Sequence, residues 1–268
     1  MAVTAATNGT GRIMLLLVDT WYLFEKYLRL SIRMPLWTLF GLIQPLIWLV
    51  IFGQLFKNMA ELQGFPAGSY LEFLTPGILV MTVLFGSSWS GVNLLREINF
   101  RIIEKMLVTI VSRGSIVLSR VLHSCLLLLI QTWVILLVVL LMGVRLPGGL
   151  NGFLWCTVIA GLLGMGFSSL SNGLAMLFKK EEPLVIMGNF MTLPVMFLSS
   201  AFVPKEFLPN WIAALSVVNP VQYAVEAMQM AFSGHWDTTD FIRPMGLLLL
   251  FTVVTFGWAA WLFRKQRD

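Results

Sequence analysis

The stretch VLSRVLHSCLLLLIQTWVILLVVLLMG, residues 117–143, decides the fold class of this chain. No charged residue follows Arg120 in it, and leucine, isoleucine and valine dominate its second half. About 20 consecutive apolar residues are enough for a helix to cross the hydrocarbon core of a bilayer. The stretch therefore predicts a membrane-spanning helix, and further stretches of the same kind accompany it on both sides.

The composition of the whole chain also indicates a membrane protein. The 268 residues are 58% hydrophobic and 12% charged, with a mean hydropathy of +0.85. Soluble domains carry about 25% charged residues, so this chain has too little charge to cover a soluble globule of its size. Disorder is excluded, because it requires low hydrophobicity and high net charge. The net charge of +5 fits basic residues at helix ends, and we expect no nucleic-acid partner.

Six apolar stretches predict an all-α integral membrane protein with six transmembrane helices. The spans are expected at about residues 36–56, 73–95, 117–143, 153–178, 184–203 and 244–263, within a transmembrane domain of residues 36–263. Pro194 interrupts the fifth span, which is tolerated in a bundle because neighbouring helices can satisfy the freed carbonyl group.

The segment before the first span predicts an amphipathic helix near residues 16–33. Leu17, Trp21, Phe24 and Leu28 recur on one stripe, and basic residues fall on the other face. This pattern is typical of a helix that lies in the membrane interface. The alternative is an extension of the first span. Residues 1–35 are then a cytoplasmic N-terminus with this helix, and residues 264–268 a cytoplasmic tail.

The basic residues predict the orientation. With the N-terminus inside, the external segments hold four of them, Lys57, Arg145, Lys205 and Arg243, and the other 14 of the 18 lie inside. Cytoplasmic loops of membrane proteins carry an excess of Lys and Arg. We therefore expect both termini in the cytoplasm and a multi-pass protein of the cytoplasmic (inner) membrane.

Two connecting segments differ from ordinary loops. The cytoplasmic one, REINFRIIEKMLVTIVSRGSI (96–116), mixes charges with a helical apolar pattern, so it needs a protein partner or the membrane surface to cover its apolar face. The external one, residues 204–240, is too apolar for a solvated loop and too broken by proline for a span. Pro209 and Pro220 each fit the start of a short helix, which predicts a re-entrant helical hairpin.

The sequence argues against three other functions: an ATPase, a secondary carrier and an intramembrane hydrolase. No glycine-rich phosphate loop is followed by Lys-Ser or Lys-Thr, so we expect no ATPase site on this chain. A secondary carrier is disfavoured because no Asp, Glu, Lys or Arg lies in the middle of a span. An intramembrane hydrolase would need His123 within reach of Ser168 or Ser169. Close helix packing at small residues explains the two serines better.

Together these features resemble the membrane subunit of ABC transporters of the drug- and polysaccharide-export type, over nearly the whole chain. The cytoplasmic motif is EKMLVTIVSRGSIVLSR (104–120), which follows Arg96-Glu97. Ile102, Ile103 and Ile110 replace the Gly-Thr pair and the proline usual there. The external motif is LSSAFVPKEFLPNWIAALSVVNPVQYAVEAMQ (198–229), which looks much like that of antibiotic-resistance permeases.

The resemblance implies roles for two sets of residues. The 96–116 segment would be a coupling helix in a groove of a separate ATPase. The alternative is a helix that lies on the membrane surface without a partner. The implied ATPase-coupling residues are Arg96, Glu97, Arg101, Glu104, Leu107 and Arg113. The implied re-entrant motif residues are Pro204, Pro209, Trp211, Asn219, Pro220 and Tyr223.

The resemblance also implies an assembly. The chain would be one half of a homodimer, or of a pair with a similar permease, and each half would bind one ABC ATPase subunit. ATP and Mg would bind only to that ATPase, and this chain would carry no cofactor, metal or catalytic residue. The expected function is efflux of a drug, natural product or lipid, with polysaccharide or lipid-linked glycan export as the alternative.

Overall fold

The computed structural model describes residues 9–33, 35–61, 68–101, 113–236 and 239–265, and these residues form helices joined by turns. The elements are α1 (Gly9–Arg33), α2 (Pro35–Leu55), η1 (Lys57–Glu61), α3 (Tyr70–Asn99), α5 (Arg113–Leu141), α6 (Gly149–Phe178), α7 (Glu181–Phe197), η2 (Lys205–Phe207), α8 (Asn210–Ser216), α9 (Pro220–Ser233) and α10 (Thr239–Lys265). The prediction of an all-α protein is confirmed for this part of the chain.

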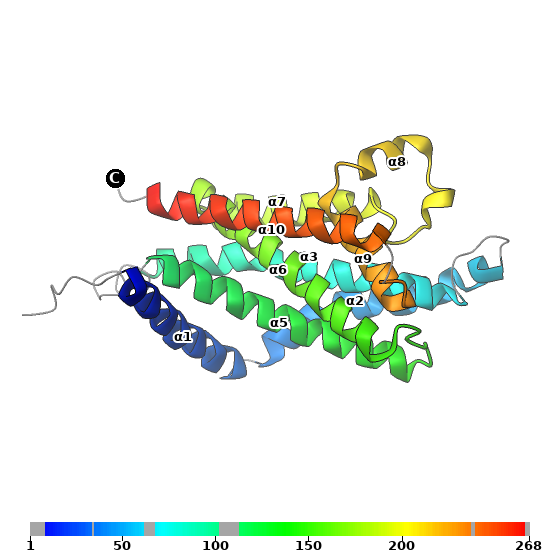
Figure 1. Cartoon of the computed structure of the whole chain (residues 1–268), viewed down its shortest axis with the longest axis horizontal. Coiled ribbons are helices and arrows are strands. Elements are labelled where there is room, and N and C mark those ends of the chain that lie inside the picture. The colour runs from blue at the N-terminus through cyan, green and yellow to red at the C-terminus, as the bar shows by residue number, and fades with distance from the viewer. Residues whose placement is uncertain (1–8, 34, 62–67, 102–112, 237–238, 266–268) are drawn as a thin grey trace, which may run out of the picture.

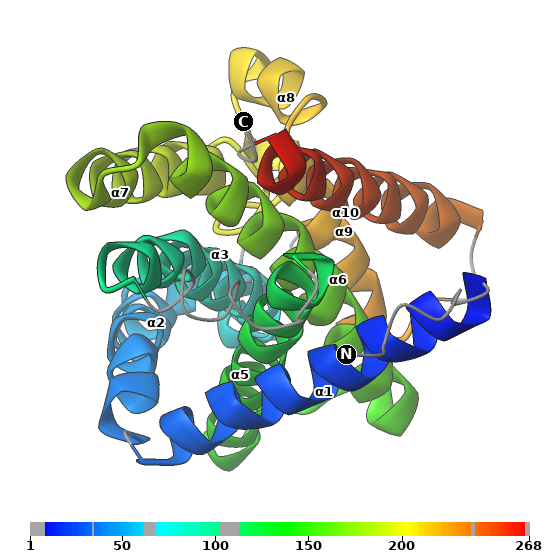
Figure 2. The same ribbon diagram turned by 90° about the vertical axis from the view of Figure 1, so that its left-hand side faces the viewer.

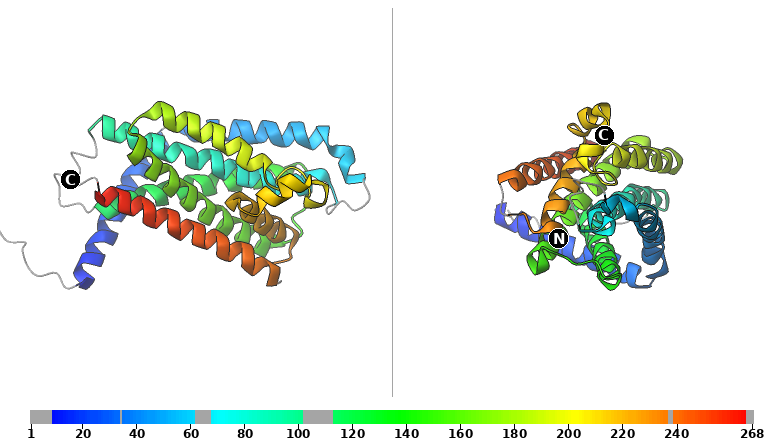
Figure 3. Two further views of the ribbon diagram at one scale, coloured as in Figure 1. Left: turned by 90° about the horizontal axis from the view of Figure 1, so that it is seen from above. Right: turned by 90° about the vertical axis from the view of Figure 1, so that its right-hand side faces the viewer.

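The long helices run along one axis as a bundle (Figure 1). One end, the basic end, holds the last turn of α3, the start of α5 and the end of α10, with α1 lying across it (Figure 2). The opposite end, the hairpin end, holds η1, α8 and α9 (Figure 3). The oblique course of α1 relative to the bundle fits a helix in the plane of a membrane interface.

Four of the described helices are long and apolar enough to cross a membrane, namely α3, α5, α6 and α10. In α2 the apolar part is the shorter Gly41–Leu55, and α7 has 17 residues. The structure therefore shows a membrane protein with several apolar helices. The assignment of α2 and α7 as further spans is a proposal.

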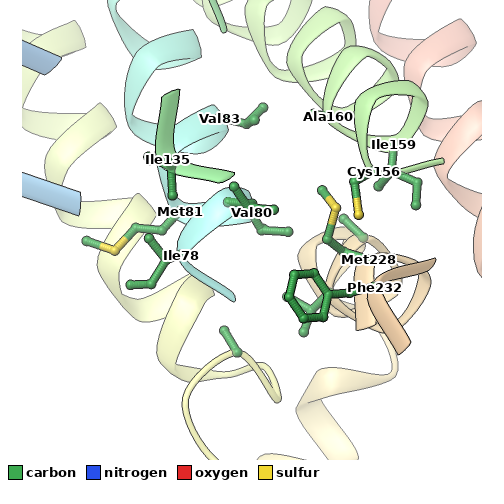
Figure 4. Packing of buried hydrophobic residues seen from close by; sticks show 14 of the residues in the cluster. Ile78, Val80, Met81, Val83, Ile135, Cys156, Ile159, Ala160, Met228 and Phe232 are labelled. Carbon is green, nitrogen blue, oxygen red and sulfur yellow. The ribbon is translucent and has the colours of Figure 1, made fainter. Parts of the chain in front are cut away.

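The core lies where α3 and α6 cross and α9 packs against both. Figure 4 shows Val80 and Val83 of α3 on the side toward Ile159 of α6 and Met228 and Phe232 of α9. Between membrane helices the gain comes mainly from close packing, because lipid tails are as apolar as leucine. The short helix α9 is thus an integral part of the bundle and fixes the hairpin end against it.

The fifth apolar helix ends earlier than residue 203, where the sequence placed its end. α7 stops at Phe197, and the Leu198 N–H donates to the Pro194 carbonyl (2.8 Å) in its last turn. The side-chain amide of Asn219 then donates to the carbonyls of Val195 (2.7 Å) and Leu198 (3.0 Å). These bonds satisfy carbonyls that a helix end leaves without partners, so the chain can turn away here.

Candidate functional site

The proposed coupling segment joins α3 to α5 at the basic end. α3 ends at Asn99, and the Phe100 N–H donates to the Arg96 carbonyl (2.9 Å). Arg101 then has a left-handed backbone (φ 53°), which is unusual for a residue with a side chain and turns the chain away from the helix axis. Glu104 and Leu107 lie outside the described residues, and Arg113 is the first residue of α5.

A buried charge cluster, formed by Tyr27, Glu97 and Arg120, lies directly beside this junction. Glu97 Oε2 is 2.5 Å from Arg120 Nη1 and accepts a hydrogen bond from the Tyr27 hydroxyl (3.0 Å). The Arg120 guanidinium also lies over the Tyr27 ring, 5.5 Å from its centroid. The Tyr27–Glu97–Arg120 cluster therefore joins α1, α3 and α5 at one point.

Burial makes this cluster energetically important. The side chains of Arg120 and Glu97 are only 6% and 19% exposed, and burial raises the pKa of Tyr27 to about 12, so its hydroxyl remains a donor at neutral pH. Removing one partner of a buried ion pair costs about 3–5 kcal/mol, because the other charge is left uncompensated. We expect each member of the cluster to depend strongly on the other two.

Polar groups continue from the cluster into the bundle. Arg120 Nη2 lies 3.5 Å from the carbonyl of Ser90 on α3. The Ser90 hydroxyl contacts Ser124 on α5 (3.0 Å) and accepts a hydrogen bond from Asn172 on α6 (3.2 Å). Buried polar groups need such partners because burial without them is costly. The network thus connects α6 to the same point as α1, α3 and α5.

The neighbouring residue, Arg96, points elsewhere. Its Nε donates to Glu181 Oε2 at the start of α7 (3.1 Å), and the two side chains are 49% and 32% exposed. Exposed ion pairs contribute only about 0–1 kcal/mol. Of the two adjacent residues that the sequence assigned to ATPase coupling, Glu97 faces α1 and α5, and Arg96 lies at the surface beside α7.

The hydrolase alternative finds no geometric support among the described residues. His123 Nε2 lies 2.8 Å from the Ser31 hydroxyl of α1, which occupies that ring nitrogen. The buried hydroxyls of Ser168 and Ser169 have no hydrogen-bond partner in the described part of the chain. The histidine and these serines are therefore not arranged as a nucleophile and its base.

At the hairpin end, the predicted motif residues shape a compact structure. Pro204 and Pro209 precede η2 and α8, and Trp211 on α8 is exposed. Asn219 caps α9, because its Oδ1 accepts the Val221 N–H (2.9 Å), and Pro220 is the first residue of that helix. The Tyr223 hydroxyl donates to the Val217 carbonyl (2.5 Å) and so closes the connection between α8 and α9.

An apolar groove of about 310 Å³ lies between α3, α6, α7 and α10. Its wall includes Leu84, Phe167, Leu170, Leu174, Met187 and Phe251. The hydroxyls at its edge are occupied: Ser88 donates to Leu84 (3.0 Å), Ser171 to Ser88 (2.8 Å) and Thr192 to Gly188, all at backbone carbonyls. The groove therefore offers an apolar surface with few free polar groups.

A second cavity, of about 610 Å³, opens at the hairpin end between α9, the start of α10 and residues 200–217. Its polar lining includes Lys205, Gln222, Tyr223, Glu226, Gln229 and Arg243. Lys205 forms an ion pair with Glu226, which also accepts a hydrogen bond from Gln222 Nε2 (2.9 Å). This cavity therefore has a more polar lining than the apolar groove.

Sequence reasoning did not find the partners within the cluster. It placed Arg120 only as a basic residue entering the third span, and it assigned Tyr27 no role. The residue type gave no signal, since Tyr22 on the same helix has the same side chain and is exposed. The contact itself joins residues 70 positions apart, which no local pattern shows.

Comparison with known proteins identifies the family. The sequence model described as "ABC-2 type transporter" matches residues 18–233. The chain belongs to the ABC-2 type transporter family. It is 34% identical over 211 residues to the transport permease ycf38 of Porphyra purpurea. The aligned region covers 78% of this chain and 72% of the relative.

Drug-resistance permeases are among the relatives of this ABC-2 chain. The doxorubicin resistance ABC transporter permease protein DrrC of Mycobacterium tuberculosis (strain H37Rv) is 25% identical over 189 residues, 70% of this chain and 67% of DrrC. The daunorubicin resistance permease DrrB1 of Streptomyces coeruleorubidus is 24% identical over 199 residues, 73% and 69% of the two chains. ABC-2 permeases lack an ATPase site of their own and work with an ABC ATPase subunit.

Proposed function

We propose that this chain is the permease subunit of an ATP-driven exporter for a lipophilic or amphipathic molecule. In this assembly α2, α3, α5, α6, α7 and α10 are the six spans, and α8 and α9 form a re-entrant hairpin on the external side. The basic end faces the cytoplasm, and the protein lies in the cytoplasmic membrane. Two permease chains form a homodimer with two ATPase subunits, which bind ATP and Mg.

The observation that carries this proposal is the apolar groove. It has about 310 Å³, which is within the range of cavities that hold small organic ligands. Since its hydroxyls are bonded to backbone carbonyls, a ligand there would bind by apolar contact and shape. A drug or lipophilic natural product fits this surface, and the resistance functions in the names of DrrC and DrrB1 support the same ligand class.

The positions of the charges argue against ion-coupled transport. α2 and α6 contain no Asp, Glu, Lys or Arg, and the charges of α3, α5, α7 and α10 lie toward their ends. Carriers that couple to protons or sodium usually hold an ionisable residue inside the membrane. An ATPase partner is therefore the better energy source for this permease.

The cavity at the hairpin end favours the alternative cargo, a polysaccharide or lipid-linked glycan. The charged groups of Lys205, Glu226 and Arg243 lie in its wall, and such groups can form hydrogen bonds with sugar hydroxyls. The two cargo classes can be separated by the ligand that stimulates ATP hydrolysis. A lipid-linked glycan that stimulates hydrolysis where doxorubicin does not would support the alternative.

The proposal is tested with inside-out membrane vesicles. The chain is co-expressed with the ABC ATPases of its source organism, one at a time, and uptake of doxorubicin is followed by its fluorescence with and without ATP. We expect ATP-dependent uptake with one of them. Met187→Trp, which fills the apolar groove, should reduce uptake several-fold. The matched control is Ile186→Trp, at a residue 57% exposed on the same helix, which should transport normally.

Two outcomes would contradict the proposal in this form. The first is the absence of ATP-dependent uptake with every ATPase that associates with the chain. The second is equal uptake by the Met187→Trp and Ile186→Trp proteins, since a ligand in the groove should respond to only one of them.

A further inference from the structure

The Tyr27–Glu97–Arg120 cluster sits at the two attachment points of the coupling segment. Glu97 is in the last turn of α3, just before residues 102–112, and Arg120 is near the start of α5, just after them. Any displacement of the segment must act on one or both of these helices. The 2.5 Å ion pair between Glu97 and Arg120 holds the two helices to each other at this level.

The same cluster attaches α1 to this pair of helices. Tyr27 donates to Glu97 from α1, while α1 is also held to α5 by the hydrogen bond from the Ser115 hydroxyl to the Leu16 carbonyl (3.1 Å) and by the Ser31–His123 contact. Tyr27 is 5% exposed and lies on the buried face of α1. The carboxylate of Glu97 is thus shared between α5 and α1.

Charge gives this junction a property that apolar packing lacks. The hydrogen bond from Tyr27 to Glu97 is directional, and the attraction between Glu97 and Arg120 depends on the distance between the two charges. Energetic coupling between sites travels through packed residues and hydrogen-bond or salt-bridge networks of this kind. A buried ion pair is also weak evidence for stability in itself, because apolar residues of similar volume often pack as well.

We propose that Tyr27, Glu97 and Arg120 are positioning residues for energy coupling: they make α1, α3 and α5 move as one unit when the ATPase displaces the segment between residues 102 and 112. This inference rests on the proposed function, since it requires an ATPase partner. It assigns α1 a part in transport in addition to its place in the membrane interface.

The experiment separates coupling from stability by replacing the charges with apolar residues. The double variant Glu97→Leu/Arg120→Met removes both charges together, so neither is left buried alone. Tyr27→Phe removes only the hydroxyl and keeps the ring. Glu25→Gln, in an exposed ion pair with Arg29 on α1, is the matched control. Each complex is purified with its ATPase and reconstituted, and three quantities are measured: the melting temperature, the amount of bound ATPase, and doxorubicin transported per ATP hydrolysed.

We expect the double variant and Tyr27→Phe to retain the bound ATPase and to hydrolyse ATP. The amount of doxorubicin transported per ATP hydrolysed should fall about fivefold or more in the double variant, which corresponds to the lower end of typical coupling free energies. It should also fall measurably in Tyr27→Phe. Glu25→Gln should match wild type. A merely structural role would lower the melting temperature and leave the ratio unchanged in the protein that remains folded.

A wild-type ratio in the double variant would overturn the inference. If that variant does not assemble, Tyr27→Phe provides the test. An unchanged amount of doxorubicin transported per ATP hydrolysed in this single variant overturns the role of α1 and with it the proposal. Failure of the proposed function is distinguishable, because the wild-type complex itself would then neither bind the ATPase nor transport doxorubicin.

Discussion

Gly91 of α3 lies at a close contact with α6. A Cβ atom at this position would lie 2.3 Å from the carbonyl oxygen of Ser171 on α6, far inside van der Waals contact. The Gly91 N–H also donates to the Ser171 hydroxyl (3.0 Å). Small residues allow membrane helices to approach in this way. The close approach of α3 and α6 therefore depends on this missing side chain.

We predict that Gly91→Ala destabilises the permease. The neighbouring atom is backbone and cannot rotate away, so α3 and α6 must separate, at a cost of about 1–3 kcal/mol. Thermal unfolding in detergent measures the effect. The control is Gly257→Ala on α10, where no atom lies within 4 Å of the added Cβ. Equal melting temperatures for the two variants would contradict the tight contact.

The Glu97–Arg120 contact shows why single residues were harder to predict than helices. The pattern of residues 96–116 indicated a segment with a partner, but it treated Arg96 and Glu97 as equivalent. In the structure one is exposed and the other faces α5 and α1. Which of two adjacent charges is buried depends on helix rotation, and that is set by tertiary packing.

Among the elements, α7 and α9 are held together by Asn219. This one side chain caps α9 and also donates to two carbonyls at the end of α7. Because Asn219 is buried, water cannot easily replace these hydrogen bonds when the side-chain amide is removed. The hairpin is thereby attached to the transmembrane part through a helix cap.

We expect Asn219→Ala to loosen the start of α9. Loss of an N-cap costs about 0.5–2 kcal/mol, and two buried carbonyls lose a donor in addition. Hydrogen exchange should become faster at the first turn of α9 and at the end of α7. Asn210→Ala, at an exposed residue of α8, is the control and should leave both regions unchanged. Equal exchange in the two variants would show that Asn219 does not hold the hairpin.

The helical type of the elements was predictable from the sequence, whereas their contacts were not. Apolar length and proline positions indicated the helices, and the fifth ended early because a side chain 24 residues beyond Val195 satisfies its carbonyls. For α1 the sequence identified an apolar stripe through Leu17 and Trp21, yet both are exposed, and Leu23 and Tyr27 are buried instead. A hydrophobic pattern alone does not distinguish the face toward lipid from the face toward protein.

At the scale of the whole molecule, basic residues concentrate at one end of the bundle. Arg96 in the last turn of α3, Arg120 near the start of α5 and Lys179 at the end of α6 lie there. Lys and Arg near the ends of spans favour the cytoplasmic side. We therefore expect the hairpin end, where Ser233 is exposed at the end of α9, to face outward.

We predict that single cysteines report this orientation. Ser233→Cys should react with a membrane-impermeant thiol reagent in intact cells, and Lys179→Cys should react only after the membrane is permeabilised. Cys125 and Cys156 are buried, so the native thiols should give little background. Labelling of Lys179→Cys in intact cells, with Ser233→Cys protected, would reverse the topology.

If the cargo is lipophilic, as we propose, the lipid bilayer would act as a reservoir for the apolar groove between α7 and α10. A cargo that dissolves in the membrane would be concentrated there before it meets the groove, so the effective concentration at the site is set by partitioning as well as by the aqueous dose. Each additional methylene group on such a cargo favours the bilayer by about 0.8 kcal/mol. In a series of analogues that fit the groove equally well, the apparent Michaelis constant, expressed as an aqueous concentration, should therefore be inversely proportional to the lipid–water partition coefficient. The maximal rate of transport should stay the same.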